Sequence, residues 1–284
     1  MTARLLDGKS LANTIRQQMA GQAAAFQTRT GRMPTLGILV IGDNPAAASY
    51  LRSKEAACRK TGIATRTTRL PETCGEAAAL QVVRDWNDDP TVDGMIVETP
   101  LPPGMDLLRL ARSIDPGKDV DGFHPENLGL LLRGCPRFVP CTPAAAMLLL
   151  DSLSMPLAGL RAVIVGRSLV VGRPLFLLML ERHMTVTVCH SRTADLAAEV
   201  ARADVVVAAA GAPGLVRGAW IAPGAVVIDV GINVLPDGTI TGDVEFEPAV
   251  QTAAAITPVP GGVGPVTVAL LMRNLLTAAA SSAS

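Results

Sequence analysis

Along the first hundred residues, stretches with a helical repeat of apolar positions alternate with short stretches that are almost continuously apolar. The helical repeat covers residues 10–29, about 45–60 and 76–86. Strands are expected at residues 35–42, 64–70 and 94–99. Because a helix separates each strand from the next, this pattern predicts a parallel sheet with right-handed crossovers.

The alternation resumes after residue 141 with more strongly apolar strands. Thr142-Pro143 is a suitable N-cap and first turn for a helix to about Leu153, and further helices are expected at 172–182 and 195–202. Strands are expected at residues 162–166, 185–189, 205–210 and 225–231. This succession predicts a Rossmann-type, doubly wound nucleotide-binding domain over residues 141–264. Residues 265–280 form an apolar helix that is expected to pack back on the first domain.

The predicted fold is therefore α/β, with two domains and a cleft between them. Residues 1–140 plus 265–284 form an N-terminal three-layer α/β domain, and residues 141–264 form the Rossmann-type domain. A chain of 284 residues is long enough for this division.

Composition and charge narrow the class of ligand. Lys and Arg number 25 and so do Asp and Glu, which argues against a nucleic acid or a membrane surface as partner and favours a small molecule. No apolar run reaches the roughly 18 residues of a membrane span, and no secretory signal is visible at the start. Five scattered cysteines indicate a reducing, cytoplasmic setting, and three histidines without ligand spacing make a metal site unexpected.

The first turn of the second domain departs from the common G-x-G-x-x-G phosphate loop. After Gly166 the next glycine is Gly172, so the loop Gly166-Arg167-Ser168 to Gly172-Arg173-Pro174 is longer than usual. Free N–H groups at the start of the following helix would still face an anion. A plain turn between strand and helix is the alternative.

The end of the next strand bears on the choice of dinucleotide. NAD sites usually place an acid there, but this chain has Ser191-Arg192-Thr193 and no acid before Asp195. Arg192, with Arg167, would suit a ribose 2′-phosphate, so NADP is favoured over NAD. The alternative for each arginine is a solvated surface charge.

Polar residues in the first domain gather where its strands end. Tyr50 and Lys54 share one helix face, Glu98 ends a strand, and Asp121 lies in the loop after it, so the carboxyl end of the sheet is the expected ligand site. An exposed helical pair is the plainer interpretation of Tyr50 and Lys54. The glycine-rich stretch 258–267 indicates close passage of backbone past a flat or charged group, or a tight loop that joins the domains.

Nearly end to end, these motifs resemble the bifunctional methylenetetrahydrofolate dehydrogenase/methenyltetrahydrofolate cyclohydrolase family. The residues that carry the resemblance are Asp7-Gly8-Lys9, Asn44-Pro45-Ala46 with Ser49, Tyr50 and Lys54, Pro100-Leu101-Pro102, Lys118-Asp119-Val120-Asp121-Gly122, Pro140-Cys141-Thr142-Pro143, Gly166-Arg167-Ser168 with Val171-Gly172-Arg173-Pro174, Asp229-Val230-Gly231-Ile232-Asn233, and Pro260-Gly261-Gly262-Val263-Gly264-Pro265.

The resemblance implies an NADP-dependent oxidation of 5,10-methylenetetrahydrofolate and a hydrolysis of the methenyl product to 10-formyltetrahydrofolate. It implies that Tyr50 lies along the pterin and p-aminobenzoate, that Lys54 activates water, and that Asp121 pairs with the 2-amino-4-oxo edge of the pterin. It places Pro260, Gly261 and Gly262 between folate and nicotinamide, and it suggests a homodimer joined through the cofactor domains. The implied cofactor-binding residues are Gly166, Arg167, Ser168, Gly172, Arg173, Pro174, Ser191, Arg192, Thr193 and Ile232.

One position departs from the family pattern, which usually has Gln hydrogen-bonded to the lysine where this chain has Glu98. A carboxylate there favours the ammonium form of Lys54, a poorer base, so we expect the dehydrogenase to survive and the cyclohydrolase to be weakened. Retention of both activities is the alternative. The sequence also leaves open a monofunctional dehydrogenase, an NADP dehydrogenase for another small substrate, and a non-enzymatic folate- or nucleotide-binding regulator.

Overall fold

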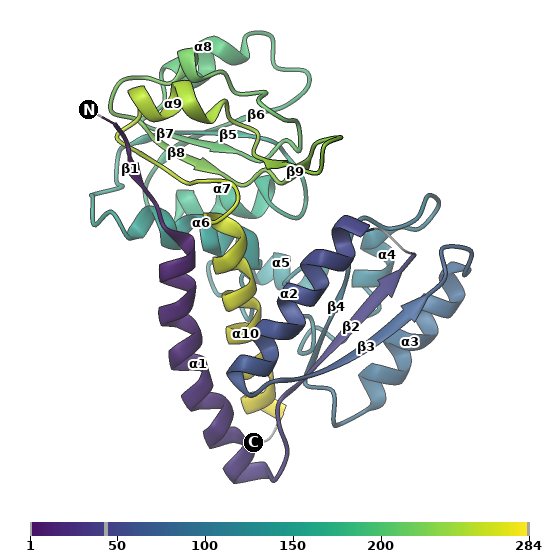
Figure 1. Cartoon of the computed structure of the whole chain (residues 1–284). Coiled ribbons are helices and arrows are strands. Elements are labelled where there is room, and N and C mark those ends of the chain that lie inside the picture. Colours follow the sequence, from purple (N-terminus) through teal and green to yellow (C-terminus); the bar gives the residue numbers. More distant parts are fainter. Residues whose placement is uncertain (1, 43–44, 283–284) are drawn as a thin grey trace. The chain divides into compact units, whose positions relative to one another are not determined.

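The structure is a computed structural model that describes residues 2–42 and 45–282, with the side chains of residues 45–50 left undescribed. The chain divides into two compact units, each with its own sheet (Figure 1). The first unit comprises Met1–Ala12 and Pro140–Thr267, and the second comprises Asn13–Val139 and Val268–Ser284. Each unit is an α/β fold with a parallel sheet, which confirms the predicted fold class.

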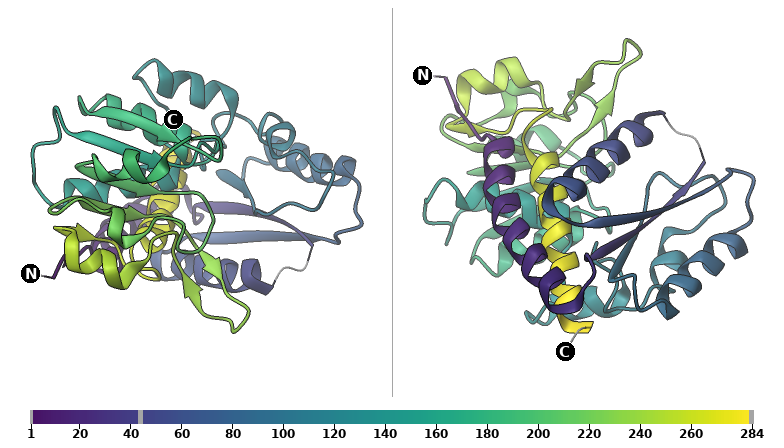
Figure 2. Two further views of the ribbon diagram at one scale, coloured as in Figure 1. Left: turned by 90° about the horizontal axis from the view of Figure 1, so that it is seen from above. Right: turned by 60° about the horizontal axis from the view of Figure 1, so that its bottom comes forward.

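The second unit is built on a three-stranded parallel sheet in the order β3 (Ala64–Leu70), β2 (Thr35–Ile41), β4 (Gly94–Val97). The helices connected to these strands are α1 (Gly8–Thr30), α2 (Pro45–Thr61), α3 (Glu76–Asp88), α4 (Leu107–Ala111), α5 (Pro125–Leu132) and α10 (Val263–Ser282). The Gln22–Arg29 part of α1 and Leu276 and Ala280 of α10 line a common surface hollow, and these helices lie side by side in all views (Figure 2).

Successive side chains along each strand point to opposite faces of this sheet, and different helices cover the two faces. A Cβ at Gly37 would come within 2.8 Å of the Trp86 ring, so the β2 face with Gly37 and Leu39 packs on α3. A Cβ at Gly94 would meet Leu275 of α10 at 3.0 Å, so the opposite face is covered by α10. These two helical coverings make the three layers expected for this domain.

The first unit contains a six-stranded parallel sheet in the order β1-β11-β8-β7-β5-β6. Its strands are β1 (Arg4–Leu5), β5 (Arg161–Val165), β6 (Thr185–Cys189), β7 (Val205–Ala208), β8 (Val226–Asp229) and β11 (Ala255–Ile256), and its helices are α6 (Cys141–Asp151), α7 (Gly172–Leu180), α8 (Leu196–Ala201), α9 (Phe246–Thr252) and the short η1 (Gly218–Trp220). A hairpin of β9 (Asn233–Val234) and β10 (Ile240–Thr241) follows β8. The chain order reverses between β5 and β7, which is the arrangement of a doubly wound domain.

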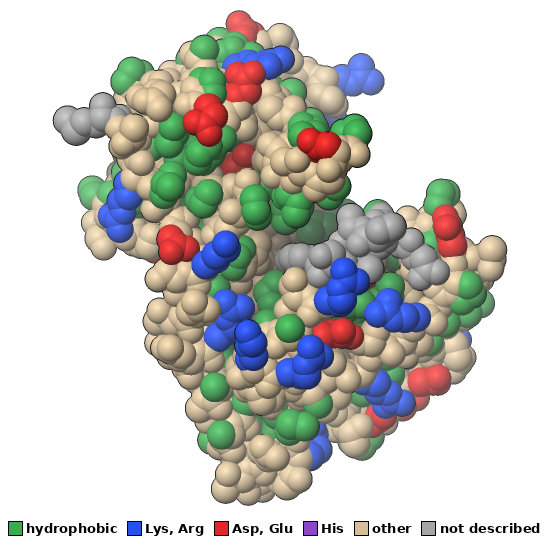
Figure 3. Space-filling view, in the orientation of Figure 1, with side chains coloured by type: hydrophobic (Ala, Val, Ile, Leu, Met, Phe, Trp, Pro, Cys, Tyr) green, Lys and Arg blue, Asp and Glu red, His purple; other side chains and the backbone are tan. Residues whose placement is uncertain are grey.

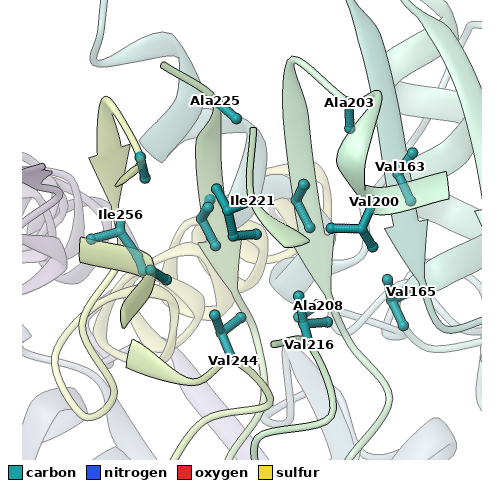
Figure 4. Packing of buried hydrophobic residues seen from close by; sticks show 14 of the residues in the cluster. Val163, Val165, Val200, Ala203, Ala208, Val216, Ile221, Ala225, Val244 and Ile256 are labelled. Atoms are coloured by element: carbon teal, nitrogen blue, oxygen red, sulfur yellow. The ribbon is translucent and has the colours of Figure 1, made fainter. Parts of the chain in front are cut away.

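One face of this sheet buries a core of small and β-branched side chains (Figure 4). Val163 and Val165 of β5 lie beside Val200 of α8, while Ile221 and Val244 lie over β7 and β8. Aliphatic residues of this size pack closely between a sheet and helices, and their burial stabilises this unit.

The structure differs from the sequence expectation in three places. Residues 1–12, expected in the first domain, belong to the other unit because Arg4 and Leu5 pair with Ala255 and Ile256. Helix α6 begins at Cys141 with Pro140 at its N-cap, so the N-cap prediction for Thr142 is wrong. Third, α10 meets the length and hydropathy of a membrane span, which a search for an uninterrupted apolar run did not show. However, 67% of its 18-residue apolar window is buried, as in a core helix.

Candidate functional site

The second unit holds a buried ion pair at the carboxyl end of its sheet. The Lys54 Nζ of α2 donates to Glu98 Oε1 at 2.6 Å, and the two residues are only 8% and 7% exposed. Both residues were predicted from sequence, and the structure brings them together. Because each charge is removed from water, loss of either partner would leave a buried and unbalanced charge.

Glu98 is fixed by the strand it follows. Its backbone N–H donates to Leu39 O at 2.9 Å, which extends the pairing of β4 with β2 by one residue. The alternation that directs Gly94 to the α10 face therefore directs Glu98 to the same face, toward α2. The peptide bond between Thr99 and Pro100, which follows, is cis.

The loop that carries Asp121 runs beside β4. Asp119 forms an isolated parallel bridge with Met95, and the chain turns directly after it. Asp121 is half-buried and lines a small pocket with Val97 and Phe123. Tyr50 belongs to α2, but its side chain lies outside the described residues, so its role stays a prediction.

Buried polar contacts hold this loop in place. The Lys118 ammonium donates to three backbone carbonyls around the end of α3, those of Trp86, Asn87 and Asp89, at 2.8, 2.9 and 2.8 Å. Asp119 is 1% exposed and accepts from Asn127 and from the His124 N–H, and burial raises the pKa of its carboxyl.

Helix α10 also reaches this loop. The Asn274 amide donates to Val120 O at 2.9 Å and to Val139 O at 3.1 Å. The contact is made to the residue next to Asp121. A helix that is far away in sequence therefore helps to hold the loop that carries the predicted pterin-binding carboxylate. The sequence offered one sign of this role, the polar Asn274 within a mostly apolar helix.

The glycine-rich stretch closes on the start of α1 within the first unit. A Cβ at Gly8 would overlap Gly262 O at 1.7 Å, and Gly261 has a φ of 118° that favours glycine. The Val259–Pro260 peptide is cis, and Gly264 lies near the Ile232 side chain. These contacts explain why side chains are absent here, while the expected place of this stretch against the substrate stays a prediction.

A pocket of about 520 Å³ opens at the carboxyl ends of β5, β6 and β7. Five residues predicted to bind the cofactor line it: Gly166, Arg167, Ser168, Ser191 and Thr193. Its other lining residues are Val165, His190, Leu196, Ala209, Ala210, Ala212 and Leu215, which sequence reasoning did not single out. The predicted residues Gly172, Arg173, Pro174, Arg192 and Ile232 are not part of this lining.

Both glycines of the first turn permit close backbone approach. A Cβ at Gly166 would meet Ala209 O at 2.1 Å, and a Cβ at Gly172 would meet Gly166 O at the same distance. The Ser168 Oγ accepts from the Val171 N–H at 3.1 Å, and the Ser168 carbonyl accepts from the Arg173 N–H at 3.0 Å. The expectation of free N–H groups at this helix start is therefore wrong, because Ser168 already accepts from them.

The electrostatics of the pocket suit an anion. No carboxylate lines it among the residues that the structure describes, and Asp195, the nearest acid after β6, accepts from the Ala198 N–H as the N-cap of α8. Arg167 and Arg192 are exposed and form no ion pair within the described part of the chain. A 2′-phosphate would meet positive charge here without repulsion.

Basic side chains also gather over α1 and α2 of the second unit (Figure 3). Arg16 and Lys60 line a shallow groove there, together with polar residues such as Asn13 and Ser53 and with no acid. Lys54 is not part of this lining. Within the described ranges no group of His, Cys, Asp and Glu is arranged to hold a metal ion.

Comparisons with known proteins cover the chain almost completely. The family model for the tetrahydrofolate dehydrogenase/cyclohydrolase catalytic domain matches residues 6–121, and the model for the NAD(P)-binding domain of the same family matches residues 140–283. The chain belongs to this family. "Bifunctional protein FolD" of Acidiphilium cryptum is 47% identical over 281 residues, which cover 99% of each chain. The protein of the same name from Roseiflexus is 48% identical and covers 98% of this chain and 97% of its own length.

Solved structures of family members agree with the fold. The bifunctional FolD enzyme of Campylobacter jejuni has a TM-score of 0.94 at 40% identity and covers 98% of this chain and 99% of its own. The Trypanosoma brucei enzyme, complexed with NADP and an inhibitor, has a TM-score of 0.95 at 38% identity and covers 99% of both chains. The family suggested by the sequence motifs is thereby confirmed.

Proposed function

We propose that this chain oxidises 5,10-methylenetetrahydrofolate to 5,10-methenyltetrahydrofolate with NADP and hydrolyses the product to 10-formyltetrahydrofolate. Membership of the family over nearly the whole chain supports both activities. The observation that carries the assignment to this site is the buried Lys54–Glu98 pair at the carboxyl end of the sheet, in the same unit as Asp121. A buried lysine at the carboxyl end of a parallel sheet is more typical of a catalytic or binding site than of a solvated surface.

The oxidation needs positioning more than proton transfer. Loss of a hydride from the methylene bridge leaves a cation shared by two nitrogens, and the nicotinamide of NADP supplies the hydride acceptor. In this chain, Asp121 would accept two parallel N–H bonds from the pterin edge, and Tyr50 would lie along the ring. The loop that carries Asp121 is fixed by the contacts of Lys118, Asp119 and Asn274, and these contacts would serve the oxidation by keeping Asp121 in position.

The hydrolysis needs a group that handles a proton. Lys54 is the predicted residue, and its Nζ is within 2.6 Å of Glu98 Oε1. To act as a neutral amine, Lys54 would have to leave the Glu98 carboxylate buried without a counter-charge, which is unfavourable. The negative charge of Glu98 would also stabilise the methenyl cation before it reacts. We therefore propose that hydrolysis in this chain is slower than it would be with Gln at position 98.

The cofactor pocket of the first unit is proposed to bind NADP rather than NAD. The absence of a lining carboxylate and the presence of Arg167 support this preference. Purified protein should reduce NADP in the presence of methylenetetrahydrofolate, with a much higher Michaelis constant for NAD. Lack of turnover with methylenetetrahydrofolate and either dinucleotide would refute the proposed function, and turnover of another substrate would favour the alternative dehydrogenase.

We further propose a homodimer joined through the cofactor-binding units and a cytoplasmic setting. All five cysteines are free, and Cys58, Cys141 and Cys189 are buried, which is compatible with a reducing compartment. Light scattering coupled to size-exclusion chromatography tests the dimer, since a monomeric mass at micromolar concentration would exclude it.

A further inference from the structure

Two buried aspartates lie behind the cofactor pocket, in motifs to which the proposed reaction assigns no role. Asp243 is 0% exposed and follows the β9–β10 hairpin. Its Oδ2 accepts from the Ala210 and Gly211 N–H groups at 2.6 and 2.9 Å, and its Oδ1 accepts from the Ala212 N–H at 3.0 Å. Three consecutive N–H groups thus converge on one carboxylate.

The three residues whose N–H groups Asp243 accepts from form one wall of the cofactor pocket. Ala210 and Ala212 line the pocket directly, and Gly211 lies between them with a φ of 65°. Converging N–H groups of this kind form a concavity that binds anions. Here the concavity is occupied by the Asp243 carboxylate, which is not exposed in the pocket. The other side of the 210–212 loop faces the pocket. The loop has no regular secondary structure to hold its shape, so Asp243 supplies the missing hydrogen-bond acceptors.

Asp243 is itself held by Asp229 at the end of β8. Asp229 Oδ1 accepts from the Asp243 and Gly231 N–H groups at 3.0 and 2.9 Å, and its Oδ2 accepts from the Val244 N–H at 2.9 Å. The Asn233 amide donates to Asp243 Oδ1 at 2.8 Å. The two carboxylates therefore connect β8 to the pocket wall after β7.

Two glycines make room for this arrangement. A Cβ at Gly231 would come within 2.3 Å of Asp243 Oδ1, and a Cβ at Gly242 would come within 1.9 Å of Asp229 Oδ2. Neither glycine has a positive φ, so each is required by space and not by backbone conformation. The motifs Asp229-x-Gly231 and Gly242-Asp243 are thus two halves of one interlocking unit.

We infer that Asp243 is a positioning residue for dinucleotide binding, which fixes the 209–212 wall of the cofactor pocket through its hydrogen bonds to Ala210, Gly211 and Ala212. The inference rests on the proposed function, because it assumes that this pocket takes NADP. Asp243 does not line the pocket, so its effect reaches the dinucleotide only through the wall.

The test is the Asp243→Asn variant of the full chain. An amide keeps the size of the side chain but turns an NH₂ group toward at least one N–H donor, so the wall loses its shape. We expect the Kd for NADP, measured by calorimetry, to rise about ten- to a hundredfold, as for displacements of about 1 Å in a binding site. The Michaelis constant for NADP should rise in parallel, while that for methylenetetrahydrofolate stays within about twofold because Lys54 and Asp121 belong to the other unit.

Two controls separate positioning from general loosening. Glu245→Gln changes a neighbouring acid that holds Arg217 and Gly218, neither of which lines the pocket, and should leave the Kd unchanged. Ile221→Ala removes a core side chain near the amino end of β8 and should lower the melting temperature without changing the Kd.

An unchanged Kd in Asp243→Asn, or an equal rise in Ile221→Ala, would overturn the inference. If Asp243→Asn does not fold, Asn233→Ala removes one donor to the same carboxylate and should raise the Kd by a few-fold, and no rise would overturn the inference equally. Wild-type protein that fails to bind NADP would overturn the proposed function and, with it, this inference.

Discussion

Replacement of Glu98 by Gln tests whether the Glu98 carboxylate slows hydrolysis while leaving the rate of oxidation unchanged. The variant keeps an oxygen acceptor for Lys54 Nζ but removes the negative charge that lies 2.6 Å from it. In the wild type, a neutral Lys54 would leave a carboxylate that is only 7% exposed without its partner. Removing one member of a buried pair costs about 3–5 kcal/mol.

Only part of that free energy falls on the rate of hydrolysis, because bound substrate and water will take over some contacts of Glu98. If a third to a half of it does, about 1–2.5 kcal/mol, hydrolysis of methenyltetrahydrofolate should be about five- to seventyfold faster in Glu98→Gln. This range lies below the full contribution of general acid–base catalysis, about 10²–10⁴, as expected if Glu98 only weakens Lys54. The dehydrogenase kcat should change by no more than about threefold, since hydride loss needs no proton transfer.

Both rates are followed spectrophotometrically on purified protein, with methenyltetrahydrofolate alone for hydrolysis and with methylenetetrahydrofolate and NADP for oxidation. The matched control is Glu55→Gln on the same helix, whose carboxylate accepts from Thr67 Oγ1 and not from Lys54. Equal hydrolysis by wild type and Glu98→Gln would refute the reasoning and show that both activities tolerate Glu98.

Three further predictions concern charge. Lys54→Met should lower the rate of hydrolysis by at least about a hundredfold. It also leaves the Glu98 carboxylate without its partner, so the melting temperature of the variant should fall and should recover in the double variant Lys54→Met/Glu98→Gln. No recovery would show that loss of the ion pair is not the cause of the fall. Burial, opposed by three backbone N–H donors, raises the pKa of Asp229 to about 6 from 3.8. Ionisation of Asp229 is thus less favourable in the folded state. The free energy of unfolding should therefore fall by about 2 kcal/mol as pH rises from 4 to 6.5. A carboxyl ¹³C titration midpoint near 4 would contradict this. Arg167→Ala should raise the Michaelis constant for NADP at least about tenfold and that for NAD little, whereas Arg182→Ala, which breaks a surface pair with Asp151, should change neither.

Hydrophobic patterning alone determined most of the regular elements of this protein. The strands at 64–70 and 185–189 have the predicted bounds, and α3 and α8 begin within one residue of expectation. Buried parallel strands and amphipathic helices have repeats that depend only on local side chains, so they can be read without tertiary information. Glu98 and Asp121 were selected because carboxyl ends of parallel strands meet at one edge, and Lys54 was selected by its helical spacing from Tyr50.

Only the tertiary structure decided the contacts between segments distant in the chain. Strand β1 was missed because two residues carry no periodicity, and its partner β11 lies about 250 residues away. Ser168 lines the cofactor pocket as predicted, but the bond from the Val171 N–H to its hydroxyl could not be foreseen. Asp243 gave no sequence signal of its place behind the pocket wall, since the three N–H groups that it accepts from lie 31 to 33 positions earlier in the chain. Hydrogen bonds of this kind depend on distance and direction in space, which local sequence patterns do not encode.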